Sequence, residues 1–292
     1  MPDSSTPILP PEIILHNTLS LGQSGLAQCA RINKTWYGCC IPLLWKVVQI
    51  FRRKDIDCLD SPEGLAGLIR NAHHTHTLAT SQASVAKSFA FRASPPYTAL
   101  KTLRYQVRGE QSMRLRLEAQ TEAEDSLGYS QVLCRLLNQN PGLRSLTVGG
   151  EWLMNALDVE DINGVLKCIP TAELDRLEIT FDYTSNKQSQ NAMAFAQVFA
   201  DQDMEPFVSL KELIITDCFE GQFGEPGFEK WCIKRCVSLE SIRLENCGSH
   251  SLENFARSVF VSCPKLTRLA FRSDGEEDDT TLMHVVMMSF EG

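Results

Sequence analysis

The sequence predicts an α/β solenoid of repeated strand–loop–helix units, preceded by a small helical module. The first observation behind this prediction is a repeated frame, which is written in SLKELIITDC from Ser209 and again, 29 residues later, in SLESIRLENC from Ser238. The second is that helical patterns separate the copies of the frame. One such unit cannot cover its own apolar face, whereas a stack of units can, so the repetition itself indicates a solenoid.

The frame predicts a strand in every copy. Counted from its leading leucine, it places apolar residues at positions one, four and six, and the last two of these obey the two-residue period of a strand. Residues at positions three, five and seven then face the opposite side of the sheet. A weaker copy, HTLATS, begins at His76. The leading leucines, 27 to 43 residues apart, are Leu100, Leu143, Leu174, Leu210, Leu239 and Leu266.

The stretches between the copies predict helices. Apolar residues recur at helical spacing in residues 130–141, 159–170, 191–200, 227–236 and 251–264. Three of these stretches contain a proline just before the next frame, at Pro141, Pro170 and Pro264, and proline does not continue a helix. The repeating unit is therefore a strand, a loop, a helix and a second loop.

This frame resembles the leucine-rich repeat, in which parallel strands line the concave side of a horseshoe and helices form its convex side. The resemblance extends from about Leu100 to the C-terminus. Because solenoids bind partners along their concave side, it implies a target-binding surface at the outward strand positions. An ordinary solvated strand face is the alternative. The candidate target-binding residues are Arg176, Glu178, Glu212, Ile214, Thr216, Ser241, Arg243, Glu245, Arg268 and Ala270.

Residues 9–45 predict a separate helical module. Pro10 and Pro11 suit a first helical turn. After a break at residues 22–25, a stripe that runs from Leu26 to Asn33 predicts a second short helix, with Cys29 and Ala30 between them. The large side chains of Trp36 and Trp45 supply apolar area that a bundle of this size needs.

The order of these residues resembles the F-box, and its trailing Leu-Trp resembles fungal members of that family. An F-box binds the Skp adaptor of cullin-based ubiquitin ligases. The resemblance implies that the adaptor, and through it a cullin, docks on this module. All six implied adaptor-facing residues could instead be core residues of the bundle. They are Leu9, Pro10, Ile13, Ile14, Leu26 and Trp36.

The two resemblances together predict the substrate-recognition subunit of a Skp-cullin-F-box ubiquitin ligase. Its parts would be an F-box-like module in residues 1–50, a connecting segment with a degenerate first repeat in residues 51–98, and the solenoid in residues 99–292. Asn17 and Thr18 stand where the F-box usually has aliphatic residues. That departure leaves open a non-ligase leucine-rich-repeat scaffold with a degenerate F-box. The last residues, 280–292, have the pattern of a further helix, as in a C-terminally truncated fragment.

Composition narrows the classes of ligand and the cellular compartment. The net charge of −8 and the pI near 5.3 disfavour nucleic acid as a ligand. The eleven cysteines are odd in number and scattered. No apolar run approaches membrane-spanning length, and no signal-peptide pattern opens the chain. These features predict free thiols and a cytoplasmic and/or nuclear protein that does not contact membranes.

No local signature of catalysis, cofactor binding or phosphate binding occurs, so we expect no enzyme activity, no cofactor and no metal. Two clusters of metal-ligating residue types could hold a metal ion, although structural roles are the simpler explanation. They are Cys218, Cys232, Cys236 and Cys247, and the histidines His73, His74 and His76. Cys218 and Cys247 are more simply explained as residues that end their strands. A basic stretch could attract an acidic partner, although a solvated strand face is the simpler explanation; it consists of Lys101, Arg104, Arg108, Arg114 and Arg116.

Overall fold

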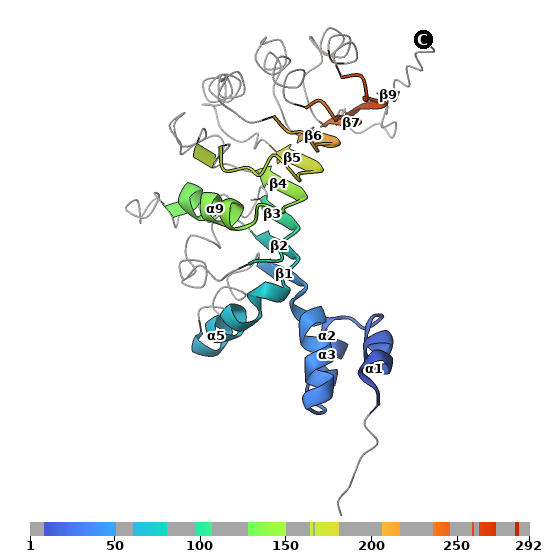
Figure 1. The fold of residues 1–292 in the computed structure, drawn as a ribbon, viewed down its shortest axis with the longest axis vertical. Coiled ribbons are helices and arrows are strands. Elements are labelled where there is room, and N and C mark those ends of the chain that lie inside the picture. Colours follow the sequence, from blue (N-terminus) through green and yellow to red (C-terminus); the bar gives the residue numbers. More distant parts are fainter. Residues whose placement is uncertain are drawn as a thin grey trace, which may run out of the picture.

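A computed structural model gives the fold of the chain (Figure 1). It describes residues 9–50, 61–80, 97–106, 128–149, 164–165, 167–180, 206–216, 236–245, 259, 263–272 and 284–285. The N-terminal module consists of α1 (Pro11–Thr18), α2 (Gln23–Cys29) and α3 (Lys34–Trp45). Beyond it, helices α5 (Pro62–Asn71) and α9 (Gly128–Gln139), with the short 3-10 helix η1 (Ala72–His74), accompany a single sheet.

Within the described residues the sheet contains nine strands in chain order, and the first eight are parallel. Strand β9 closes the order by pairing antiparallel with β8. Figure 1 shows the strands lining the concave side of a curved column, with α5 and α9 on its convex side. The strands are β1 (Val47–Ile50), β2 (Thr77–Thr80), β3 (Thr102–Gln106), β4 (Ser145–Gly149), β5 (Arg176–Thr180), β6 (Glu212–Thr216), β7 (Ser241–Glu245), β8 (Arg268–Arg272) and β9 (His284–Val285).

The pairing of the strands follows the sequence frame without a shift. Each strand from β3 to β8 begins at frame position three, and like positions pair across neighbouring strands, as Leu146 with Leu177 and Leu177 with Leu213. A parallel sheet in which every connection leads to the adjacent strand is the architecture of a solenoid. The chain is therefore an α/β solenoid of the leucine-rich-repeat type, which confirms the predicted fold class.

The sheet begins earlier than the leucine pattern indicates. The weak copy at His76 forms β2, and residues 47–50, which the sequence analysis placed in the N-terminal module, form β1. In this register Trp45 and Thr75 occupy the place of the leading leucine. Thr80 occupies an inward position, where its hydroxyl donates to the carbonyl of Ile50 at 3.2 Å. A buried hydroxyl with a partner carries little penalty, so a rung of the sheet can form without the leucine pattern.

A continuous backbone ladder connects the helical module to the solenoid. In each rung the carbonyl at frame position two accepts two N–H groups from the next rung. The ladder starts at Lys46, whose carbonyl accepts from His76 and Thr77, both at 3.0 Å, and it reaches Glu240, which accepts from Thr267 and Arg268. Since Lys46 is also the C-cap of α3, this single residue joins the helix to the sheet.

A turn that the frame did not include precedes most strands. A buried residue three positions before the leading residue accepts the leading residue's N–H, as Asn140 does from Leu143 and Cys236 does from Leu239, both at 3.1 Å. Phe207 and Cys263 make the same bond in their repeats. These turns direct the chain from the convex side back into the sheet.

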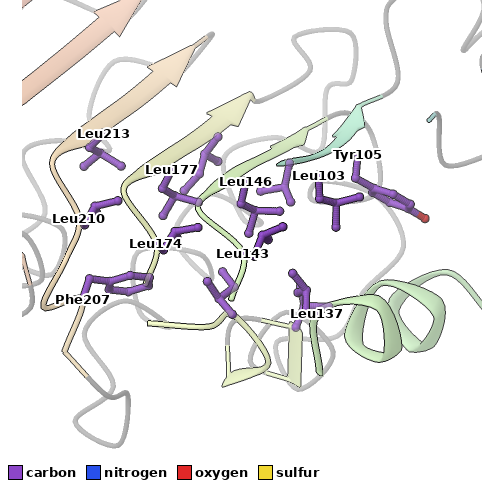
Figure 2. Close-up of a cluster of buried hydrophobic side chains, with 14 of the residues drawn as sticks. Leu103, Tyr105, Leu137, Leu143, Leu146, Leu174, Leu177, Phe207, Leu210 and Leu213 are labelled. Carbon is purple, nitrogen blue, oxygen red and sulfur yellow. The ribbon is translucent and has the colours of Figure 1, made fainter. Parts of the chain in front are cut away.

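The core is one continuous apolar cluster between the sheet and the helices (Figure 2). Figure 2 shows the leading leucines and the position-four leucines pointing to the same side, with Leu137 of α9 and Phe207 beneath them. Trp45 packs against this cluster from the end of α3. Helix α9 overlaps the predicted stretch 130–141. In the predicted stretch 159–170, residues 164, 165 and 167 are helical, and the other three predicted helical stretches lie wholly or largely outside the described residues.

The helical module differs from its prediction at both ends of the second helix. Helix α2 begins at Gln23, inside the break predicted at residues 22–25. Asn33 does not continue the second helix, because α2 ends at Cys29. Instead Asn33 is the N-cap of α3, and its side-chain carbonyl accepts from the N–H groups of Thr35 at 2.9 Å and Trp36 at 3.1 Å. Asparagine is among the best N-caps for this reason. The capping hydrogen bonds of Asn33 therefore decide its position, and its helical spacing from the apolar residues before it does not.

Candidate protein-interaction surfaces

The helical module carries most of the exposed apolar surface of the described residues. Of eleven exposed large apolar side chains, seven lie within residues 9–37. Helix α1 buries only Ile14 and Thr18 and leaves apolar side chains on its other faces. Clustered apolar exposure of this kind marks a docking surface more often than a solvated one. We call these residues the module surface: Leu9, Ile13, Leu15, Leu19, Leu21, Ile32 and Tyr37.

The six residues predicted to face an adaptor divide into two groups. Leu9, Pro10 and Ile13 are exposed at the start of α1. Ile14 and Leu26 are buried and hold the three helices together, so in this structure they form core and not surface. Trp36 is half-buried on α3. Sequence spacing alone does not distinguish Ile13 from Ile14, because α1 is apolar at both positions.

The polar residues that depart from the F-box pattern are accommodated without strain. Thr18 is buried, and its hydroxyl donates to the carbonyl of Leu15 at 3.0 Å, one turn earlier in the chain. Asn17 is exposed. A threonine that bonds its own helix loses little by burial, so Thr18 does not prevent the module from folding.

An ion network occupies the outward side of β5, β6 and β7. The Arg176 guanidinium lies 3.0 Å from the Glu178 carboxylate and 3.3 Å from that of Glu212. The Arg243 guanidinium lies 3.5 Å from Glu212 and 3.7 Å from Glu245. Five of the ten predicted target-binding residues are thus joined in one alternating chain of charges. All five are half-exposed, so the network positions side chains and adds little stability.

Two apolar residues on this outward side are buried. Ile214 is only 2% exposed, yet it lies outside the continuous core cluster, between Glu178 and Arg243 on the neighbouring strands. Ala270 is likewise buried outside that cluster. The surface therefore presents charged groups above a small apolar floor. Thr216 and Ser241 are half-buried beside it, and Arg268 is exposed.

Thr147 was not predicted to belong to this surface, although the sequence frame places it at outward position five. It is buried, and its hydroxyl donates to the Glu178 carboxylate at 3.3 Å. The ion network therefore extends by one hydrogen bond onto β4. The sequence frame could have predicted this contact, because Thr147 and Glu178 both occupy position five and pair across the neighbouring strands β4 and β5.

The cysteines in the described parts of the chain are free thiols. Burial raises the pKa of the Cys236 thiol, and the neighbouring Cys263 thiol raises it further. Burial, followed by the nearby Cys29 and Cys39 thiols, also raises the pKa of Cys40. Raised pKa values keep these groups protonated, which is typical of structural cysteines. Cys218, Cys232 and Cys247 lie outside the described residues.

The histidine cluster lies at η1 and the start of β2. The rings of His73 and His74 are 3.8 Å apart, and burial lowers the pKa of His74, with smaller contributions from His73 and His76. Within the described ranges, no group of three or more histidine, cysteine or acidic side chains is arranged to hold a metal ion. The helices in those same ranges include none with the length and hydropathy to cross a membrane.

Comparison with known proteins yields similar solved structures and no family assignment. No protein-family profile matches the chain, and no curated protein is significantly similar to it in sequence. The structure of the leucine-rich repeat-containing protein LegL7 from Legionella pneumophila is similar over 80% of this chain and 69% of that chain, at 13% identity and a TM-score of 0.43.

Proposed function

We propose that this chain is the substrate-recognition subunit of a Skp-cullin-F-box ubiquitin ligase. The module surface would dock a Skp-type adaptor, and the outward side of the sheet would hold a target protein. The chain would make and break no bond itself, and the other subunits would transfer ubiquitin to the target by proximity.

The observation that carries this proposal is the apolar exposure of α1 and its surroundings. Ile13 is exposed on a helix whose buried side is already occupied by Ile14 and Thr18, and the exposed Leu9 lies just before that helix. A short helix with apolar residues outside its core stripe is expected to be covered by a partner. The resemblance of residues 9–45 to the F-box supplies the identity of that partner.

The direct junction between module and sheet supports a recruiting role. Trp45 ends α3, packs on the core of the solenoid and occupies the first leading position of the sheet. A partner on the module would then be held at a fixed orientation to a partner on the sheet. Fixed geometry is what a proximity-based transfer needs, because it keeps the target near the reacting group.

The test measures binding of a purified Skp-type adaptor to the full chain. Ile13→Asp places a charge on the module surface, and Val208→Asp makes the same kind of change in the solenoid; both side chains are 48% exposed. Aspartate is tolerated in the first turn of a helix. We expect Ile13→Asp to weaken adaptor binding by at least about tenfold, and Val208→Asp to leave it unchanged. The double variant Leu9→Ala, Pro10→Ala should weaken binding as well.

The outcomes separate the two candidate functions. Binding that survives both module variants would show that the adaptor docks elsewhere. A folded wild-type chain that binds no adaptor would favour the alternative, a leucine-rich-repeat scaffold with a degenerate F-box. Asn17 and Thr18, which depart from the F-box pattern, are the reason to consider that alternative.

A further inference from the structure

Charge is divided between two halves of the sheet, on its outward side and at the position that leads into each strand. In the four rungs β1 to β4, frame positions two, three and five hold four lysine or arginine residues and no acidic residue. In the four rungs β5 to β8, the same positions hold four basic and four acidic residues. We call the first set the basic half; its cations are Lys46, Lys101, Arg104 and Arg144, all exposed.

The cations of the basic half are not neutralised by carboxylates. Among the described residues, no salt bridge involves Lys46, Lys101 or Arg104. Lys101 donates to the carbonyl of Gly142 at 3.0 Å, and the Glu173 carboxylate lies near its ammonium group without forming a salt bridge with it. Arg144 approaches Asp175 only at 4.0 Å, and both side chains are exposed, so that contact is weak. By contrast, Arg176 and Arg243 each lie beside two carboxylates.

The register places these cations within the reach of one short ligand. Lys46, Lys101 and Arg144 share frame position two, and His76 occupies the rung between Lys46 and Lys101. Adjacent strands lie about 4.8 Å apart, so four rungs extend over roughly 14 Å. Four or five residues of an extended peptide cover that distance.

The outward residues between the cations leave room for a ligand to approach the sheet. The outward residues there have small side chains, among them Thr77, Ala79, Thr102 and Ser145. Ala79 is buried and the three hydroxyl residues are half-buried. Hydroxyl groups can donate to a carboxylate, and small side chains let a peptide backbone approach the sheet.

We infer that the basic half binds a short carboxylate-rich segment of a partner protein. A long polyanion such as a nucleic acid fits less well, because the chain as a whole carries −8 and repels charge beyond the four rungs. A short acidic segment places its carboxylates on the four cations, and little of it extends over the rest of the sheet. This inference rests on the part of the proposed function that assigns target binding to the sheet, and it is independent of adaptor docking.

The test is fluorescence anisotropy of the full chain with a labelled ten-residue peptide of alternating aspartate, glutamate and serine. Lys101→Glu, Arg104→Glu removes two cations of the basic half, and Lys211→Glu, Lys265→Glu makes the same change in total charge just before β6 and β8. All four side chains are exposed. We expect the first variant to lose at least about tenfold in affinity and the second to lose less than about threefold, with binding that weakens as salt rises.

Three results would overturn the inference. The first is that the wild-type chain, adaptor-bound or free, does not bind the peptide. The second is an equal loss in both double variants, which would indicate attraction by total charge alone. The third is equal or tighter binding of a single-stranded oligonucleotide, which would indicate a polyanion site. The milder variant Lys101→Gln, Arg104→Gln, checked by circular dichroism, gives the same answer if charge reversal disturbs folding. Adaptor binding measured on the same samples distinguishes failure of this inference from failure of the proposed function.

Discussion

The close approach of β4 to β5 makes Gly149 a sensitive position. Gly149 is the last residue of β4 and pairs with Thr180 of β5. A methyl group added at Gly149 would lie 2.6 Å from the Cβ atom of Thr180 and 3.0 Å from its backbone carbonyl oxygen. Ordinary contacts between such atoms begin near 3.4 Å. The two strand ends would have to separate by about 1 Å, because backbone atoms cannot rotate away.

We therefore expect Gly149→Ala to lower the free energy of unfolding by about 2 kcal/mol, within the usual range for overpacking. Unfolding in urea, followed by circular dichroism, measures the change. Gly164 provides a matched control, since it is helical and exposed and an added methyl group meets nothing within 4 Å. Gly164→Ala should stabilise the chain by up to about 1 kcal/mol, through helix propensity alone.

A double variant tests whether the contact with Thr180 is the cause. Thr180→Gly removes the closest atom, so Gly149→Ala should cost less in that background, with a coupling free energy of about 1 kcal/mol. The carbonyl contact remains, and we expect only partial rescue. A loss below about 0.5 kcal/mol in Gly149→Ala, or additive effects in the double variant, would refute the proposed register and contact.

Three further predictions concern separate parts of the fold. Asn33→Ala removes the N-cap of α3 and should cost about 1 kcal/mol in unfolding free energy, whereas Asn33→Ser should cost less. The buried Cys236 thiol should resist a thiol reagent until the chain unfolds. Because burial raises the pKa of this thiol, the unfolded chain loses the proton at a lower pH than the folded chain does, and the free energy of unfolding should fall above the ordinary thiol pKa. That fall should be smaller in Cys236→Ala. Glu212→Gln should cost less than about 1 kcal/mol, and less still at high salt, because its contacts to Arg176 and Arg243 are half-exposed; a larger cost would show that the ion network stabilises the fold.

Frame positions fixed in the sequence account for most of the solenoid. The inward residues at positions one, four and six form its core, as Leu174, Leu177 and Ile179 do in β5. Side chains along a strand alternate between the two faces of the sheet, so once one face is known to be buried, the remaining residues are assigned to the opposite face. The leucine pattern did not predict the first two strands, because Trp45, Thr75 and Thr80 replace aliphatic residues there. Only the packing and hydrogen bonding of these three residues show that they occupy inward positions.

The candidate surfaces were less accessible to sequence reasoning. Ile13 and Ile14 are identical in type, and only the packing of α1 on α3 decides that Ile14 is core and Ile13 is surface. Ile214 was correctly placed on the outward side of β6, but its burial depends on neighbours contributed by other strands. A residue's exposure depends on groups distant in the chain, which local periodicity does not contain.

The sequence by itself determined the repeating unit, the strand positions from β3 to β8 and the side of the sheet on which each residue lies, because these follow from local periods of the chain. Tertiary structure alone decided how residues from different repeats meet. It placed Arg176 and Arg243 between carboxylates, left Lys101 and Arg104 without a salt bridge among the described residues, and joined α3 to the first rung. The physical reason is that charge pairing and burial act across strands, between residues about 30 positions apart.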